Sequence, residues 1–415
     1  MKLYKIFLLL LVFSATAHTQ TLKEIIYATL ENNYNIQASL TQDRAKKSSL
    51  ESVDNTYLPQ VTLGVNYSRL DLDTREVQVK NTTNGFLKLD VNLYDGGRNQ
   101  AIKNQKMYEY KSSVFRTTAT KKETILQVIT LFYQTQTILE NIKVFQEKSD
   151  TLKAQYERIQ IKYDINMATI DEVLKLKSEY ETNQFAVEEL KFQKIELMQN
   201  LNLLSNLKIT SLSDSTLPKI ENIEFIESEN VKSLTMGIKA QDEAINIVSA
   251  ITTPQFNIEN TLSAYDYNDY NERLLSDLPD QQNQLMLSLT CNLYDTVSAD
   301  KIEATRLEKV SSQQRVTFVK EQEKINFYVA KKKLRTQQLK IDSLKSAVKM
   351  GITVFEMIDI KYQNGLVDNI TYLDALSKKT YNQALYAKAL NDYEIAKANY
   401  YLSSGMNYED ALATW

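Results

Sequence analysis

The spacing of apolar residues along the chain alternates between two periods, which predicts both helices and strands. Over about 22–56, apolar residues recur every three to four positions, as on one face of a helix. Strict alternation of apolar and polar residues then predicts strands at 58–70 and 85–95. Pro59 lies where the helical period ends, and proline disfavours helix at itself and at the residue before it.

Long helices are expected after the strands, because residues that form turns are scarce. The chain of 415 residues has only 8 Gly and 4 Pro, and neither type occurs from Arg98 to Leu217 or from Asp280 to Met350. Apolar positions in the first stretch step by three and four, as in helix-on-helix packing. We therefore expect helical hairpins at about 97–205 and 297–403, made of rods that must lie against other rods.

Each helical hairpin has an expected turn where the apolar period breaks. Asn166 with Met167, and Gly365 with Leu366, lie at these breaks. Asn and Gly tolerate the left-handed backbone conformation that ends helices. The sequence thus predicts two exposed turns at corresponding positions.

The whole pattern occurs twice, so the chain reads as a tandem repeat. The letters N-L-Y-D occur at 92–95 and again at 292–295, and other short matches follow in the same order at a nearly constant separation. Repeat 1 is expected at 18–217 and repeat 2 at 218–415. The second repeat has its own strands, expected at 255–267 and 283–295. The landmark residues expected to end helices, turn the chain or cap the next helix are Pro59, Pro254, Gly96, Gly97, Asp95 and Asp295.

Composition and charge exclude several classes of function. The net charge of −3 gives no basic footprint for nucleic acid. Cys291 and His18 are the only cysteine and histidine, so catalytic Ser-His or Cys-His pairs and histidine metal sites are all but excluded. We expect no enzyme, no metal and no cofactor.

The N-terminus has the pattern of a secretory signal peptide over 1–17. A basic start is followed by a short apolar run and by Ala15-Thr16-Ala17, a small-residue cleavage site. No later stretch is apolar enough for a membrane-spanning helix. The alternating strands suit a membrane β-barrel and a soluble half-buried sheet about equally.

Several motifs together resemble the TolC-type outer-membrane efflux proteins over nearly the whole mature chain. The motifs are Thr21–Glu24, Tyr57–Gln60, Leu93–Arg98, Tyr362–Gly365 and Leu373–Ala375. The resemblance implies a mostly α, mixed α/β membrane protein that forms a homotrimer. Its four strands per chain would build a 12-stranded β-barrel in the lipid of the cell outer membrane, continued by a long α-helical periplasmic barrel.

The resemblance also implies function and partners. Such a protein is the passive exit duct of a tripartite efflux or type I secretion system in a Gram-negative bacterium. It docks onto a periplasmic adaptor, a membrane fusion protein, and through it onto an inner-membrane pump of the RND or ABC type. Which cargo and which pump stay open, because the pump chooses the cargo.

Residues at the periplasmic turns correspond to the family's gate and selectivity positions. Tyr362 matches an aromatic gate position, Asp171 and Glu172 match the residues it meets, and Asp374 matches one carboxylate of a ring. Two departures weaken the expected network: Thr371 replaces another carboxylate and Val367 replaces a basic partner.

Adaptor contacts are expected at Asn166, Met167, Gly365 and Leu366. The segments 206–232 and 403–415 are expected to form an equatorial collar. The main alternative is a soluble periplasmic coiled-coil scaffold, which would not need its strands. An enzyme or adhesin built on a barrel is a weaker alternative, because no catalytic constellation is present.

Overall fold

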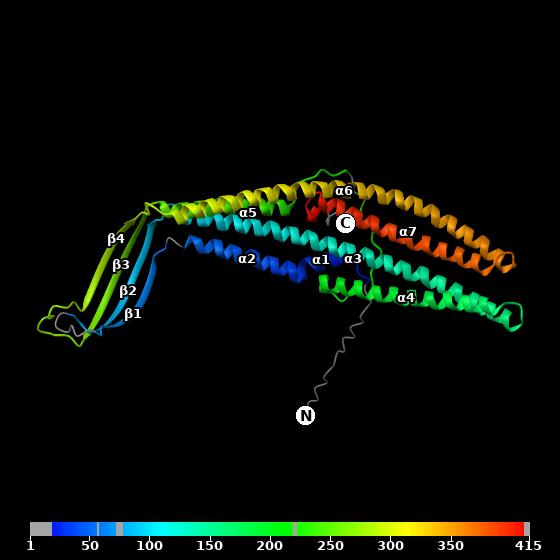
Figure 1. The fold of residues 1–415 in the computed structure, drawn as a ribbon, viewed down its shortest axis with the longest axis horizontal. Coiled ribbons are helices and arrows are strands. Elements are labelled where there is room, and N and C mark those ends of the chain that lie inside the picture. The colour runs from blue at the N-terminus through cyan, green and yellow to red at the C-terminus, as the bar shows by residue number, and fades with distance from the viewer. Residues whose placement is uncertain (1–18, 56–57, 72–77, 219–221, 411–415) are drawn as a thin grey trace, which may run out of the picture. The chain divides into compact units, whose positions relative to one another are not determined.

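The computed structural model describes residues 19–55, 58–71, 78–218 and 222–410. The predicted signal peptide 1–17, His18, Tyr57 and the last five residues of the C-terminal segment lie outside the described residues. The described part is mostly helical with one four-stranded antiparallel sheet, in the order β1-β2-β3-β4 (Figure 1). This confirms the coarse fold prediction.

The elements follow one another twice in a similar order. The helices are α1 (Leu22–Asn32), α2 (Tyr34–Asp54), α3 (Arg98–Asp164), α4 (Ile170–Ser205), α5 (Glu229–Ser249), α6 (Thr296–Gln363) and α7 (Asn369–Ser403). The strands are β1 (Gln60–Arg69), β2 (Asn81–Tyr94), β3 (Gln255–Asn268) and β4 (Gln281–Thr290). A short 3₁₀ turn, η1 (Ala250–Thr252), precedes β3.

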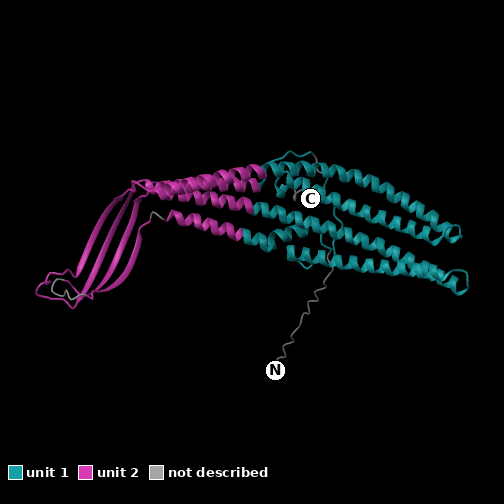
Figure 2. Ribbon diagram, viewed as in Figure 1, with its two compact units in different colours: residues 1–39, 117–229, 320–415 teal, residues 40–116, 230–319 magenta. Residues whose placement is uncertain are grey.

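The described chain divides into two units (Figure 2). Unit 1 comprises 1–39, 117–229 and 320–415, and unit 2 comprises 40–116 and 230–319. Because the unit boundaries fall within helices, α2, α3, α5 and α6 each contribute residues to both units.

The first helix is not continuous over 22–56, as the period predicted, but breaks at Asn33. The Asn33 amide nitrogen donates to the Leu204 carbonyl at 2.9 Å, while its amide oxygen accepts from the backbone N–H groups of Asn35 and Ile36. Asn33 therefore caps the start of α2 and fixes the break against α4. At the other end, Thr21 and Glu24 form a reciprocal capping box that starts α1.

In unit 2, the sheet has one apolar and one polar side, as the alternation predicted. Leu63, Leu87 and Leu262 lie opposite one another across β1, β2 and β3, and so share one side of the sheet. They are 80%, 45% and 49% exposed, so this apolar side is uncovered in the single chain. Lys88 and Glu259 lie on the other side and form an ion pair at 2.5 Å.

The prediction that N-L-Y-D ends a strand in both repeats is wrong for the second copy. β2 includes Tyr94, but β4 ends at Thr290, so Cys291–Asp295 lie outside the sheet. The reason is register. Thr290 pairs with Gln255, the first residue of β3, and nothing on β3 remains for Cys291 to pair with.

The aspartates of these motifs nevertheless cap the long helices. Asp295 accepts from the Ser298 N–H at 3.2 Å directly before α6. Asp95 lies three residues before the start of α3, and it accepts from the Asn99 N–H at 2.7 Å and from the Gly97 N–H at 3.1 Å. Gly96 and Gly97 adopt positive φ of 70° and 85°, which lets the chain reverse between β2 and α3.

Four helices of unit 2 follow one another in the order α2, α3, α5, α6. Lys46 of α2 pairs with Glu109 of α3 at 3.0 Å. Ser112 of α3 bonds to Ser233 of α5, and Asp242 of α5 pairs with Lys309 of α6. The outer members are therefore α2 and α6, each with one side that no helix of the described unit covers.

In unit 1, the order is α4, α3, α7, α6. Asn183 of α4 donates to the Phe145 carbonyl of α3 at 2.9 Å, and Asn382 of α7 donates to the Ala347 carbonyl of α6 at 3.3 Å. Between them, Tyr133 of α3 reaches Glu394 of α7. The core of this unit contains Ile25, Ile26, Ile125, Val128, Ile129, Phe132, Leu201 and Ala398.

Candidate functional site at the helical turns

The two turns between the long helices have the same backbone hydrogen bonds. In the first, the N–H of Asn166 donates to the Tyr163 carbonyl at 2.9 Å and that of Met167 to Lys162 at 2.7 Å. In the second, the N–H of Gly365 donates to Tyr362 at 3.1 Å and that of Leu366 to Lys361 at 2.9 Å. The φ values of Asn166 and Gly365 are 61° and 71°, which confirms the predicted left-handed positions.

The residues that start the return helices differ between the two turns. Before α4, the backbone N–H of Thr169 donates to the Glu172 carboxylate at 3.1 Å. Before α7, the Asp368 carboxylate accepts from the Thr371 N–H at 2.8 Å. The hydrogen bonds that Asp368 accepts from Thr371 lower the pKa of Asp368 below its usual value. Thus the position of Thr371, where a carboxylate was expected, corresponds to Glu172 in the other turn.

Below the turns, the two helical hairpins pack against each other through one apolar cluster in unit 1. All four long helices contribute to it: Leu152 and Ile159 from α3, Val173 and Leu176 from α4, Phe355 and Ile358 from α6, and Tyr372, Leu373 and Leu376 from α7. The Tyr362 ring stacks on Tyr372 with centroids 4.6 Å apart, and Phe355 lies against Tyr372 at 5.7 Å.

The side chain of Tyr362 is half-buried. Its hydroxyl has no hydrogen-bond partner among the described residues. Burial raises the pKa of Tyr362, and the nearby charge of Glu172 raises it further, while Arg158 opposes the shift. The structure therefore brings Tyr362 close to Glu172 across the two hairpins.

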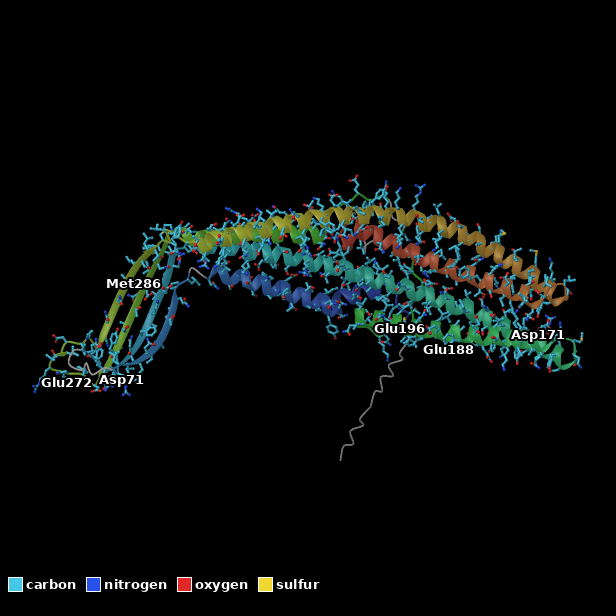
Figure 3. The ribbon with its side chains drawn as sticks, in the orientation of Figure 1. Asp71, Asp171, Glu188, Glu196, Glu272 and Met286 are labelled. Carbon is cyan, nitrogen blue, oxygen red and sulfur yellow. The ribbon has the colours of Figure 1, made fainter. Side chains whose placement is uncertain are left out.

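The other predicted site residues lie apart from this pair. Asp171 is exposed in the first turn of α4, beside the loop after α3 (Figure 3). Asp374 is exposed on α7 and forms an ion pair with Lys378 at 2.7 Å. Met167 and Leu366 are 71% and 72% exposed at the two turns, where they are free to contact another protein.

Sequence reasoning did not identify Tyr372 or Arg158. Tyr372 is completely buried and stacks against Tyr362, but its position is typical of any core residue of a helix. Only the packing of α6 on α7 reveals the stack. No group of three or more residues that could hold a metal occurs in the described part of the chain.

Comparisons with known proteins agree with the family resemblance. The family model described as outer membrane efflux protein matches residues 25–206. This match covers 182 of the 415 residues and supports the resemblance stated above, with the outer-membrane location and the non-enzymatic conduit that it implies. No curated protein matches the chain.

Solved structures share the fold of this chain over nearly its whole length. The CmeC outer membrane channel of Campylobacter jejuni has a TM-score of 0.82 at 15% identity, covering 92% of this chain and 85% of its own. The outer membrane protein VceC of Vibrio cholerae has a TM-score of 0.80 at 10% identity, covering 93% and 96%. A membrane protein of Pseudomonas aeruginosa has a TM-score of 0.80 at 15% identity, covering 92% and 90%.

None of the helices in the described ranges is long and apolar enough to cross a bilayer.

Proposed function

We propose that three copies of this chain form a passive duct that crosses the outer membrane and continues through the periplasm. The observation that carries the proposal is the pair of open edges on the sheet. β1 and β4 each pair on one side only. Unpaired backbone groups are not tolerated in lipid, so β1 of one chain must pair with β4 of the next.

Strand number favours three copies. Two copies would give eight strands, and the interior of an eight-stranded barrel is filled by side chains or holds one small ligand. Three copies give twelve strands and a wider lumen, in agreement with the family resemblance. The apolar side of the sheet then faces lipid and the polar side faces water.

The helices have matching open edges. Along α6, exposed apolar residues recur on one side: Leu307, Phe318, Ile325, Leu339, Met350 and Ile360. Along α4, Leu174, Phe185, Phe192 and Leu203 do the same. In the trimer, these two edges cover each other between neighbouring chains and make the 12-helix periplasmic barrel.

The two halves of each chain, 18–217 and 218–415, act as repeats that each supply two strands and one long helical hairpin.

The detergent-purified protein in planar bilayers tests the duct. We expect a trimer that conducts ions with a preference for cations, because three copies of Asp374 would surround a narrow axis. Asp374→Ala should lower the cation preference, while Glu188→Ala, in the similarly exposed pair with Lys191 on α4, should not. A water-soluble single chain without conductance would instead support the coiled-coil scaffold.

The gate is proposed at Tyr362 with Asp171 and Glu172. Tyr362→Ala removes the ring that stacks on Tyr372 and should raise the conductance of the closed channel. Tyr163→Ala is the matched control, because Tyr163 holds the same place in the first turn. If both variants raise conductance equally, the gate does not depend on Tyr362.

Adaptor docking is proposed at Asn166, Met167, Gly365 and Leu366, and the adaptor would link the duct to a pump of the RND or ABC type. In a Cys291→Ser background, a photo-crosslinker at position 366 should capture a periplasmic adaptor. A crosslinker at Leu274, equally apolar and 63% exposed between β3 and β4, should not. Capture from position 274 alone would place docking elsewhere.

A further inference from the structure

A cavity of about 560 Å³ opens over α5 in unit 2, between α3 and α6. Polar and basic side chains from the three helices meet there with a glycine. The residues that matter are Arg116 of α3, Ser233, Gly237 and Gln241 of α5, and Ser312 and Arg315 of α6. The predicted duct function does not account for this cavity.

The charge of the cavity is uncompensated. No carboxylate lines it, and neither Arg116 nor Arg315 forms an ion pair with any described residue. Nearby carboxylates are used elsewhere: Asp242 pairs with Lys309, and Glu109 pairs with Lys46. Two guanidinium groups on facing walls are suited to a carboxylate or phosphate, because each can donate two parallel hydrogen bonds.

The floor of the cavity is polar and fixed in place. The hydroxyls of Ser112 and Ser233 each donate to the other residue's carbonyl oxygen at 2.8 Å. The Gln241 amide nitrogen donates to the Ser312 hydroxyl at 3.0 Å, which leaves the buried Gln241 amide oxygen without a donor. A ligand that brings its own O–H or N–H would satisfy this oxygen.

Gly237 keeps the floor open. A Cβ built at this position meets no atom within 4 Å, so no close packing requires glycine. Glycine inside a helix is less stable than alanine by about 1 kcal/mol. The space that its missing side chain leaves belongs to the cavity.

We propose that this cavity binds a soluble anion, a phosphate or carboxylate that also carries an O–H or N–H donor. The arginines bind the anion from both walls, and Gln241 accepts the donor. α5 lies between α3 and α6, so the cavity opens on a face of this helix layer rather than at its edges. Pairing of edges between chains therefore leaves it open.

The cavity lies too far from the sheet for a lipid headgroup to be the anion. Arg116 comes 18 residues after the start of α3 and Arg315 comes 19 residues after the start of α6. At about 1.5 Å per residue, both lie roughly 27 Å along the helices from the strands, whereas headgroup layers are only about 5–8 Å thick. This choice of source rests on the proposed membrane barrel, while anion binding itself does not.

Inorganic phosphate titrated into the purified oligomer at constant ionic strength tests the site. A bound anion raises the thermal-unfolding midpoint in a saturable way. Arg116→Gln and Arg315→Gln should each weaken the apparent affinity at least tenfold, as expected for a lost bidentate contact of roughly 1.4 kcal/mol or more. Arg306→Gln should not, because Arg306 pairs with Glu303 away from the cavity.

One further variant and one further probe make the result decisive. Gly237→Leu fills the floor but keeps both arginines, and it should abolish the effect of phosphate. Sulfate, which has the same shape but no O–H at neutral pH, should bind more weakly than phosphate. Equal binding of sulfate and phosphate would overturn the role of Gln241.

Other outcomes would overturn the site itself. Absence of a saturable phosphate effect, or its equal loss in Arg306→Gln, would refute the anion site even if the protein conducts ions normally. Stabilisation by phosphatidylglycerol vesicles that Gly237→Leu abolishes would assign the site to a lipid headgroup and refute the soluble anion. A protein that binds phosphate but forms no channel would refute the duct and leave the site intact.

Discussion

Lys397 and Glu394 hold the segment that links the two halves of the chain against α7. The Lys397 ammonium donates to the Leu217 carbonyl at 2.5 Å and pairs with Glu394 at 2.9 Å, while Glu394 accepts from the Leu217 N–H at 2.7 Å. The Lys397 side chain is buried, and the Glu394 side chain is only 12% exposed. Burial raises the pKa of Tyr133, and the nearby charge of Glu394 raises it further.

Breaking this buried pair should destabilise the protein strongly. Lys397→Met leaves Glu394 buried and unpaired, which costs about 3–5 kcal/mol. Lys378→Met breaks the exposed pair with Asp374 on the same helix and should cost less than about 1 kcal/mol. Chemical denaturation of the two variants measures the difference, and equal losses would show that the buried pair contributes no more than the exposed one.

Asp368 should make the start of α7 sensitive to acid. Its pKa in the folded protein is lowered, so its contribution to stability is complete above the pKa of the unfolded chain, about 3.9. That contribution is lost as the pH falls through the lower folded value. The hydrogen-exchange protection factor of the Thr371 amide should therefore fall only in acid, below about pH 4.

Asp368→Asn provides the control for this prediction. Asparagine keeps an acceptor for the Thr371 N–H but does not titrate. Exchange at Thr371 should then lose its acid-dependent step. If the variant and the wild type respond equally to acid, another group controls the turn.

At the scale of elements, the sequence was sufficient to predict helices whose apolar pattern continues over many residues, and turns that depend on the conformational preference of one residue. α3 follows from apolar stepping in a stretch without Gly or Pro, and most of α6 follows from a second such stretch that ends at Met350. The turns follow from the φ preference of Asn166 and Gly365. The break at Asn33 depends on a contact with Leu204 that is distant in sequence. The early end of β4 depends on the register with β3.

For the candidate site, the sequence predicts the residues at the turns but not the contacts between the helices. The exposed turn residues follow from their positions at the ends of helices. The neighbourhood of Tyr362 and Glu172 came from the family resemblance, and no local pattern connects them. The stack of Tyr362 on Tyr372 needs the packing of α6 on α7, which a period of apolar residues does not specify.

The polar side of the sheet carries charges that should influence ion selectivity. Asp90 lies opposite Glu259, and Lys88 pairs with Glu259, so each chain presents one cation and two anions on this side. In the proposed barrel they face the lumen. Lys88→Gln should raise the cation preference about twofold or more, and Asp90→Asn should lower it.

The reversal potential across a salt gradient measures this effect. Lys47→Gln serves as the control, because its exposed pair with Glu51 on α2 lies outside the sheet. Normal conductance with unchanged selectivity in both sheet variants would show that the sheet does not select ions. The cation preference would then arise elsewhere along the duct.

At the scale of the whole molecule, assembly should depend on the apolar side of α6. Phe318 and Ile325 are 66% and 62% exposed although both are large and apolar. Covering each side chain with a neighbouring chain would contribute about 1.5–3 kcal/mol, and a closed ring makes that contact at every interface.

Charges on this side should therefore prevent assembly without unfolding the chain. Phe318→Glu combined with Ile325→Glu should convert the trimer to single chains, as measured by light scattering in detergent, while helix content by circular dichroism stays unchanged. Thr317→Glu adds a charge at an exposed position beside the apolar row, and should leave the trimer intact. Persistence of the trimer in the double variant would mean that chains meet through other surfaces, because two buried and unpaired carboxylates per interface cost more than the lost apolar contacts alone.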